Sequence, residues 1–199
     1  LSTQFGFMRK LLIFLSLLLL KFSEGNEAAV PFSPVDRWYE VYLGEAKVGY
    51  AHDRMVLQRE RVISQNEFVM KLNRAGQTLE VRSTQQTIEK PNGELVEFST
   101  EMKMAGIPIT KRGRVEGEEL VIREKQFIQA KENRYPFDER GKMSWGIRRE
   151  FLKRGFKKAG KEYSILVYSP DMGMRAPSQA KVRCHGKKTF RQGGQTVEG

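Results

Sequence analysis

The sequence predicts a mainly β fold: a curled antiparallel meander, forming a half-barrel or open barrel, with one short amphipathic helix. Three observations support this fold class. Apolar and polar residues alternate in several successive stretches, as expected for strands with one buried face. Short turn signals containing Gly or Asn-Gly separate these stretches, and such connections make neighbouring strands antiparallel. Helical periodicity is found in a single segment, so little else is available to cover the sheet.

The first predicted hairpin follows the loop around Pro31 and Pro34. It consists of Trp38–Leu43 and Lys47–Leu57, which are rich in aromatic and β-branched residues and are interrupted at Gly44. Further strands are expected at Glu67–Leu72, Thr78–Ile88, Leu95–Met104, Ile109–Val115 and Leu120–Arg123. The turn signals between them are Ala75-Gly76, Pro91-Asn92-Gly93, Gly106 and Glu116-Gly117-Glu118. A meander of long strands twists, so we expect it to curl around a concave side.

The segment Met143–Arg154 is predicted to be the helix that covers this concave side. Met143, Ile147 and Phe151 recur at helical spacing, and the opposite side carries Arg148, Arg149 and Lys153. We prefer this packing role to that of a helix on a membrane surface, because the chain offers no other helix to cover the sheet.

Beyond the helix, Tyr163–Tyr168 is expected to be a strand. Ala180–Cys184 and Lys188–Phe190 are expected to pair with each other around His185-Gly186-Lys187. Arg191–Gly199 reads as a turn followed by the start of a further strand, so we expect the domain to be truncated at its C-terminal end.

The N-terminal residues have the features of a secretory signal peptide. Met8, Arg9 and Lys10 precede the run Leu11–Leu20, which is apolar except for one serine. This run is much shorter than the roughly 20 residues of a membrane-spanning helix, so an uncleaved anchor is the weaker alternative.

Cleavage is predicted between Gly25 and Asn26, where small residues precede the bond. The expected organisation is upstream residues plus the signal peptide in 1–25, a linker in 26–36 and a β-rich domain in 37–199. We therefore expect a periplasmic or secreted protein, exported by the segment Met8–Gly25.

The chain is strongly basic, with a formal net charge of +11. Such a charge favours polyanionic partners in general. Basic and acidic residues are nevertheless interspersed, as in Gln58–Arg61, which is typical of a solvated mixed surface. No recognisable nucleic-acid-binding motif is present, so nucleic acid is not an expected partner. Membrane contact is expected only through the signal peptide before its cleavage.

No complete active site can be assembled from the residue types available. Cys184 is the single cysteine, and His185 beside it would point to the opposite side of a strand. A Cys184/His52 pair is the remaining nucleophilic arrangement, and we prefer to interpret Cys184 as a small core residue. Two histidines and one cysteine do not match a zinc pattern. We therefore predict no catalytic, cofactor-binding or metal residues and no cofactor.

Three other groups are functional candidates by residue type. Gly193-Gly194 lacks the lysine and helix start of a phosphate-binding loop, and Glu118-Glu119 lies in a predicted turn. Aromatic residues cluster in the first hairpin, where cross-strand packing is preferred to a sugar-stacking platform. They are Trp38, Tyr39, Tyr42 and Tyr50.

The first hairpin, Trp38–Gly44 followed by Lys47–His52, resembles the opening of bacterial transglutaminase-like superfamily proteins of the cell envelope. In those proteins a similar hairpin begins a non-catalytic N-terminal β domain. Further agreement follows in order at Gly93-Glu94-Leu95, Phe98, Met102, Met104, Gly117, Leu120-Val121-Ile122, Pro136, Trp145–Leu152 and Tyr163–Pro170. The region is also similar to periplasmic half-barrel families related to lipoprotein carriers.

The resemblance implies an exported accessory domain that positions a substrate or partner for a papain-like cysteine catalytic core beyond Gly199. The parent protein would then be a transglutaminase-like acyltransferase or peptidase. One alternative is a periplasmic half-barrel that binds a lipid or acyl group in its concavity. Another is an envelope protein-interaction module that uses a sheet edge. The expected partners are accordingly the protein's own catalytic domain, an envelope protein or an acyl ligand, with the substrate and oligomeric state left open.

Overall fold

The computed structural model describes residues 30–74, 77–104, 106–155, 159–170, 173–186, 189–192 and 195–198. Residues Phe32–Gly199 form one compact unit. The predicted signal peptide, its cleavage between Gly25 and Asn26, and the Ala75-Gly76 turn lie outside the described residues.

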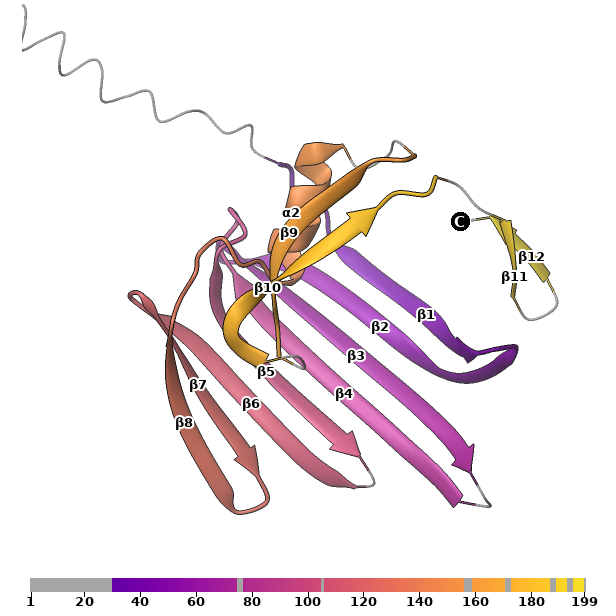
Figure 1. The fold of residues 1–199 in the computed structure, drawn as a ribbon, viewed down its shortest axis with the longest axis horizontal. Coiled ribbons are helices and arrows are strands. Elements are labelled where there is room, and N and C mark those ends of the chain that lie inside the picture. The colour runs from indigo at the N-terminus through magenta and orange to yellow at the C-terminus, as the bar shows by residue number, and fades with distance from the viewer. Residues whose placement is uncertain are drawn as a thin grey trace, which may run out of the picture. The chain divides into compact units, whose positions relative to one another are not determined.

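An antiparallel sheet of eight strands, each hydrogen-bonded to the next in chain order, makes up most of this unit (Figure 1). The sheet does not close into a barrel, and strands account for 71% of the described residues. The predicted mainly β meander with one short helix is therefore confirmed. The strands are β1 (Val35–Leu43), β2 (Ala46–Gln58), β3 (Arg61–Arg74), β4 (Gln77–Glu89), β5 (Leu95–Met104), β6 (Ile107–Glu116), β7 (Glu119–Gln126) and β8 (Gln129–Pro136).

Two strands of this sheet begin at turns that the sequence does not mark with glycine. The β2–β3 turn is built from Arg59 and Glu60 with φ of 48° and 59°, and the β7–β8 turn contains Phe127 with φ of 55°. Because glycine or asparagine usually occupies such positions, the sequence predicted β3 to begin six residues late and gave no strand at Gln129–Pro136. The polar composition of β8 concealed it further.

The remaining elements are α2 (Ser144–Arg154), β9 (Glu162–Ser169), β10 (Gly173–Arg183), β11 (Thr189–Gln192) and β12 (Gln195–Glu198). The predicted hairpin of Ala180–Cys184 with Lys188–Phe190 is wrong. Residues 178–183 of β10 pair instead with β9, so that Val182 lies opposite Tyr163, and β11 pairs with β12. Strand β9, which precedes β10, is long enough to form more backbone pairs with it than the three residues Lys188–Phe190 could form.

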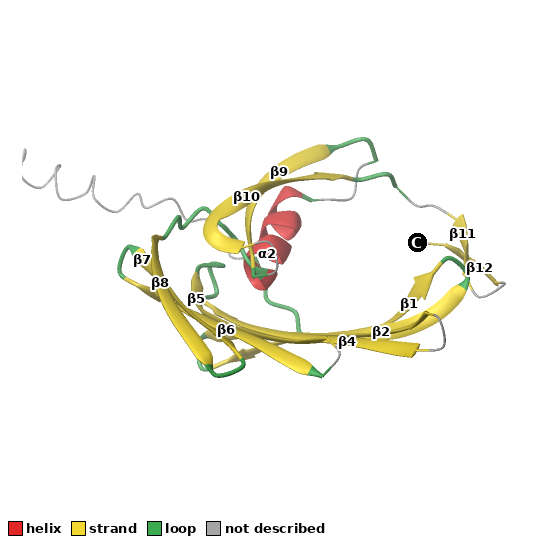
Figure 2. Cartoon of the chain, turned by 60° about the horizontal axis from the view of Figure 1, so that its bottom comes forward, coloured by secondary structure: helices red, strands yellow, loops and turns green. Residues whose placement is uncertain are grey.

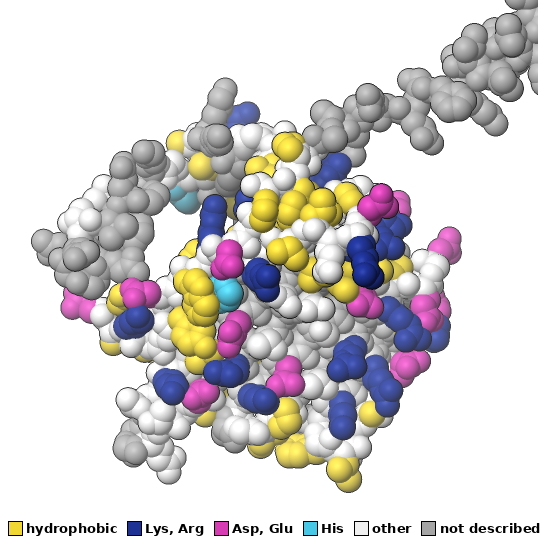
Figure 3. Space-filling model, turned by 180° about the vertical axis from the view of Figure 1, so that it is seen from behind, with side chains coloured by type: hydrophobic (Ala, Val, Ile, Leu, Met, Phe, Trp, Pro, Cys, Tyr) yellow, Lys and Arg dark blue, Asp and Glu magenta, His cyan; other side chains and the backbone are white. Residues whose placement is uncertain are grey.

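The eight-stranded sheet curls toward the side on which α2, β9 and β10 lie (Figure 2). We call this side the inner face and the opposite side the outer face. The core lies on the inner face, where Leu95, Phe98, Leu120 and Ile122 pack with Met143, Tyr168 and Met174. Gly113 is required there, because a Cβ at that position would lie 2.1 Å from the Phe98 ring. Charged side chains of both signs cover the outer face (Figure 3).

A buried carboxylate from the sheet holds the start of α2. The N-cap residue Met143 makes no side-chain capping bond. Glu89, at the end of β4, supplies the missing acceptors: it receives the backbone N–H of Trp145 at 2.7 Å and that of Gly146 at 2.8 Å. The hydroxyl of Thr87 donates to the same carboxylate at 3.0 Å. The carboxylate, which belongs to β4, thus caps the N-terminus of α2 and lies at the positive end of the helix dipole.

The buried residues of the helical segment differ in part from the predicted ones: Met143 is buried as expected, but Ile147 and Phe151 are only half-buried. Trp145, Gly146 and Arg149 are buried, whereas Leu152 is exposed. The expectation that Arg149 lies on the solvent side is therefore wrong. Its long stem packs near the β4–β5 turn, with Cδ 3.7 Å from the place where a Cβ on Gly93 would lie. Apolar periodicity alone does not show which basic side chain has such a stem contact.

We predict that Glu89→Gln lowers the free energy of unfolding at neutral pH by about 1–3 kcal/mol. The amide group would turn an N–H donor toward one of the two backbone N–H groups that the carboxylate accepts. The matched control is Glu80→Gln, which breaks only the exposed pair with Lys71 at 3.3 Å and should change stability by less than about 1 kcal/mol. Urea unfolding of the three proteins measures both effects.

Because of the buried Glu89 carboxyl group, we also predict that the stability of the protein depends on pH. Burial raises the pKa of Glu89 above the ordinary value of 4.5. The folded protein therefore holds a proton that the unfolded chain has released, and stability falls as pH rises from 4.5 through the raised pKa. In urea titrations over this range, Glu89→Gln should lack this contribution. An identical pH slope in both proteins would contradict the assignment.

We predict that Gly146→Ala destabilises the protein, although alanine is intrinsically better in a helix by about 1 kcal/mol. A Cβ at position 146 would lie 2.7 Å from the carbonyl oxygen of Gly93, so the helix must move away from the β4–β5 turn. Thermal unfolding checks the sign, with the exposed substitution Leu152→Ala as the control. A rise in melting temperature for Gly146→Ala would show that the close approach is not maintained.

Candidate functional site

The helix and the β9–β10 pair cover only part of the inner face. With 11 residues, α2 is about 16 Å long, which is short beside strands of 13 or 14 residues. Buried inner-face residues concentrate near the β4–β5 turn, including Val62, Thr87, Glu89, Leu95 and Phe98. Toward the opposite ends of β3 to β6, the inner-face side chains are only partly buried or are exposed.

These uncovered side chains form a continuous apolar surface, which we call the apolar patch. Cross-strand pairing places its members in three adjacent rows. The first row is Phe68, Ser83, Met102 and Ile109, the second is Met70, Val81, Met104 and Ile107, and the third is Leu72 and Leu79. Every member except Ser83 is apolar, and none is charged.

The patch is large enough to hold a ligand. Four strands and three rows give it dimensions of about 14 Å across the strands and about 14 Å along them. Met104 is 48% exposed and Ile107 is 41% exposed, and the other members are partly buried by their neighbours. The first row continues through Ala51 on β2 to Tyr39 on β1. The second row continues through Gly49 on β2 to Val41 on β1.

A row of polar side chains separates the apolar patch from the covered core. It runs through Asn66, Gln85, Thr100 and Lys111, which are cross-strand neighbours. Asn66 donates to the carboxylate of Asp53, and the Lys111 ammonium donates to the carbonyl of Pro170 at 3.1 Å. The row thus begins and ends with hydrogen-bonded side chains, and its polar groups separate the patch from the core.

The predicted aromatic cluster divides between the two faces. On the outer face, Trp38 stacks on His52 with 4.0 Å between ring centroids and lies 5.5 Å from Tyr50. Tyr39, the next residue in the same strand, points to the inner face. Trp38 nevertheless remains 64% exposed. Stacking across the strands therefore involves two of the four clustered aromatic residues, Trp38 and Tyr50, together with His52, and it leaves much of Trp38 in solvent.

The structure does not bring Cys184 and His52 together. The imidazole Nε2 of His52 is 2.8 Å from the carboxylate of Asp36, and its ring is covered on one side by Trp38. Cys184 lies just after β10, where its backbone bonds to Lys161 and Gly160. No hydrogen bond joins Cys184 to either histidine in the described part of the chain.

Of the other groups considered from the sequence, Gly193-Gly194 lies outside the described residues. Glu119 forms an exposed pair with Arg134 at 2.9 Å, and the same guanidinium lies 3.1 Å from the carboxylate of Glu116, the cross-strand neighbour of Glu119. Among the described residues, no group of three or more His, Cys, Asp or Glu side chains is arranged to hold a metal ion. The described residues also contain no helix with the length and apolar character needed to cross a membrane.

Comparison with known proteins identified no match: no family model, no curated protein and no solved structure corresponds to this chain. The resemblance to transglutaminase-like proteins therefore stays a prediction, as do export and a periplasmic location.

Sequence reasoning did not identify the apolar patch, although the pattern was present. Beyond the polar row, most alternate residues of β3 to β6 are apolar, as in Phe68, Met70 and Leu72. Comparing the length of the one predicted helix with the length of those strands would have shown that the helix covers too little. The patch is the candidate functional site because it is the part of the inner face that folding leaves open.

Proposed function

We propose that this domain binds the acyl chain of a lipid-like ligand on the apolar patch. The observation that supports the proposal is the uncovered, uncharged inner surface of β3 to β6. A helix that filled the entire concavity would have argued against ligand binding. Here α2 lies over one end of the inner face, and the sheet curls around the rest (Figure 2).

The chemistry of the patch favours an acyl chain over a peptide in extended form. Strands β3 to β6 each have a partner on both sides, so their backbone groups are already hydrogen-bonded. An extended peptide laid across them would leave its own N–H and C=O groups unpaired against apolar side chains, which is costly. A hydrocarbon chain has no such groups, and the one hydroxyl in the patch, that of Ser83, is not needed to bind it.

The size of the surface is consistent with measurable affinity. Covering about 200 Å² of apolar protein surface is worth about 5 kcal/mol at the usual 25 cal/mol per Å², before the costs of association. Three of the nine apolar members are methionines: Met70, Met102 and Met104. Their unbranched, polarizable side chains adapt to ligands of different shape. We therefore expect binding of long acyl chains with little preference for one chain.

The role of an accessory domain in a transglutaminase-like protein also remains a proposal. No contact among the described residues favours it over ligand binding. The two are compatible, since an acyl-binding domain can position a substrate for a neighbouring catalytic domain.

We predict that the double substitution Val81→Gln with Met102→Gln reduces affinity for a fluorescent long-chain fatty acid by at least about tenfold. Each amide would lose hydration when an acyl chain covers it, at a cost of about 1–3 kcal/mol. The matched control is Leu57→Gln, an exposed apolar residue on the inner face outside the patch. Displacement titration measures affinity, and circular dichroism verifies the fold. Equal affinity in the wild-type protein and the double variant would refute the assignment of the patch.

A further inference from the structure

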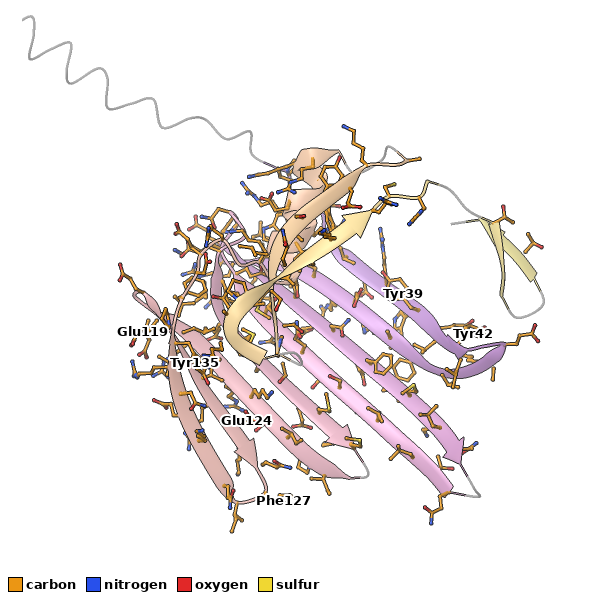
Figure 4. The ribbon with its side chains drawn as sticks, in the orientation of Figure 1. Tyr39, Tyr42, Glu119, Glu124, Phe127 and Tyr135 are labelled. Carbon is orange, nitrogen blue, oxygen red and sulfur yellow. The ribbon has the colours of Figure 1, made fainter. Side chains whose placement is uncertain are left out.

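The end of the sheet formed by the β5–β6 and β7–β8 turns exposes large apolar side chains. At the β7–β8 turn, Phe127 is 61% exposed and Ile128 is 95% exposed. Phe127 is at the lower end of the sheet in Figure 4, away from the core. Met104 and Ile107 flank the adjacent β5–β6 turn, where they form the exposed limit of the apolar patch. We call Phe127 and Ile128 the apolar tip.

The apolar tip is not explained by folding. Phe127 has a φ of 55°, a conformation that glycine or asparagine adopts with less strain. The side chain gains little burial in return, because 61% of its surface is in solvent. An isoleucine that is almost fully exposed likewise contributes nothing to the core. A partner that removes these side chains from water would explain their presence.

Three basic side chains lie on the outer face immediately beside the apolar tip. Arg112 on β6 is the cross-strand neighbour of Arg123 on β7, and Lys125 follows two residues later on the same face. They line a hollow of about 500 Å³ together with Phe127, Pro108, Thr110 and Glu101. Figure 3 shows Lys and Arg side chains on this side of the outer face, above hydrophobic atoms at its lower edge.

These three cations are available to a ligand. In the described part of the chain, none of Arg112, Arg123 and Lys125 has an ion-pair partner, whereas most neighbouring charges are paired. Glu101 lies 2.8 Å from Lys103, and Glu132, the cross-strand neighbour of Arg123, is 4.0 Å from Arg134. The hollow therefore presents a net positive surface with several hydrogen-bond donors, which suits phosphate oxygens.

From this arrangement we propose that the apolar tip and the hollow beside it bind the surface of an anionic phospholipid bilayer. Phe127 and Ile128 enter the interface between head groups and acyl chains. Arg112, Arg123 and Lys125 contact lipid phosphates on the outer face of the sheet. Apolar side chains next to basic ones are the combination that holds proteins at an anionic membrane surface. This adds a membrane contact to the one expected from the signal peptide.

The proposal does not rest on acyl binding by the apolar patch, since it concerns different residues. The two surfaces are nevertheless continuous, because Met104 and Ile107 reach the same end of the sheet. A domain docked in this way would have the open end of its apolar patch directed at the membrane. Vesicle binding and fatty-acid binding are measured separately, so the failure of one proposal can be distinguished from the failure of the other.

A fluorophore at a defined position tests the proposal without interference from the apolar N-terminal segment. An environment-sensitive label is attached to the full chain through Gln129→Cys, in a Cys184→Ser background, so that Phe127 and Ile128 are retained. The control label is attached through Arg61→Cys, at the opposite end of the sheet. Vesicles of phosphatidylcholine with and without phosphatidylglycerol are added to each protein.

We expect a blue shift at position 129 with anionic vesicles, a much smaller shift with neutral vesicles, and none at position 61. Phe127→Ser with Ile128→Ser should abolish the shift, whereas Leu57→Ser should not change it. Arg112→Gln with Arg123→Gln should raise the vesicle concentration for half-maximal shift at least about tenfold. Absence of a shift at position 129, or equal shifts at both positions, would overturn the proposal.

The same variants separate the two proposed surfaces. Phe127→Ser with Ile128→Ser should leave fatty-acid affinity within about twofold of the wild-type value. Val81→Gln with Met102→Gln should leave the vesicle-induced shift at position 129 intact. Loss of that shift in the patch variant would show that the apolar tip is not an independent membrane contact.

Discussion

The arrangement of this domain depends on one buried carboxylate, that of Glu89, which accepts two of the free backbone N–H groups in the first turn of α2. A helix that starts without a side-chain cap has unpaired donors, and a fully buried glutamate without partners would be costly. The unpaired helix donors and the buried carboxylate satisfy each other. The contact is possible only because Gly93 and Gly146 let the two backbones approach. The indole N–H of Trp145, which donates to the carbonyl of Pro91 at 2.9 Å, completes the attachment. The helix is thereby held at the β4–β5 end of the sheet.

That position divides the inner face into two parts with different roles. Near Glu89 the strands, the helix and the β9–β10 pair form a packed core around Phe98, Met143 and Tyr168. Farther along β3 to β6 the same alternation continues without a covering layer, which leaves the apolar patch open. The curl of the sheet and its fully paired central strands make this surface suited to a hydrocarbon chain. The unpaired cations and the apolar tip lie at the same end of the sheet, so the proposed lipid contacts are adjacent.

Much of the fold followed from the sequence, because alternation and turn signals are local. The strand Leu95–Met104 was predicted at its observed bounds, and the helix within one residue. The errors arose where local signals were absent or where pairing was decided by competition, as in the Arg59-Glu60 turn, the polar strand β8 and the pairing of β10. The site was harder to predict, since the apolar patch is defined by what α2 does not cover. The capping role of Glu89 and the unpaired state of Arg112 and Arg123 both depend on the strand register, which the sequence alone does not provide.

Methionine oxidation tests the division of the inner face most directly, because methionines lie in both parts. Met143 and Met174 are buried in the covered core, whereas Met102 and Met104 belong to the apolar patch. After brief treatment of the folded protein with dilute peroxide, peptide mass spectrometry gives the oxidation rate at each site. The account predicts fast oxidation at Met104 and Met102 and strong protection at Met143 and Met174. Equal protection of all four, or fast oxidation of Met143, would contradict a helix that covers one part of the inner face and leaves the other open.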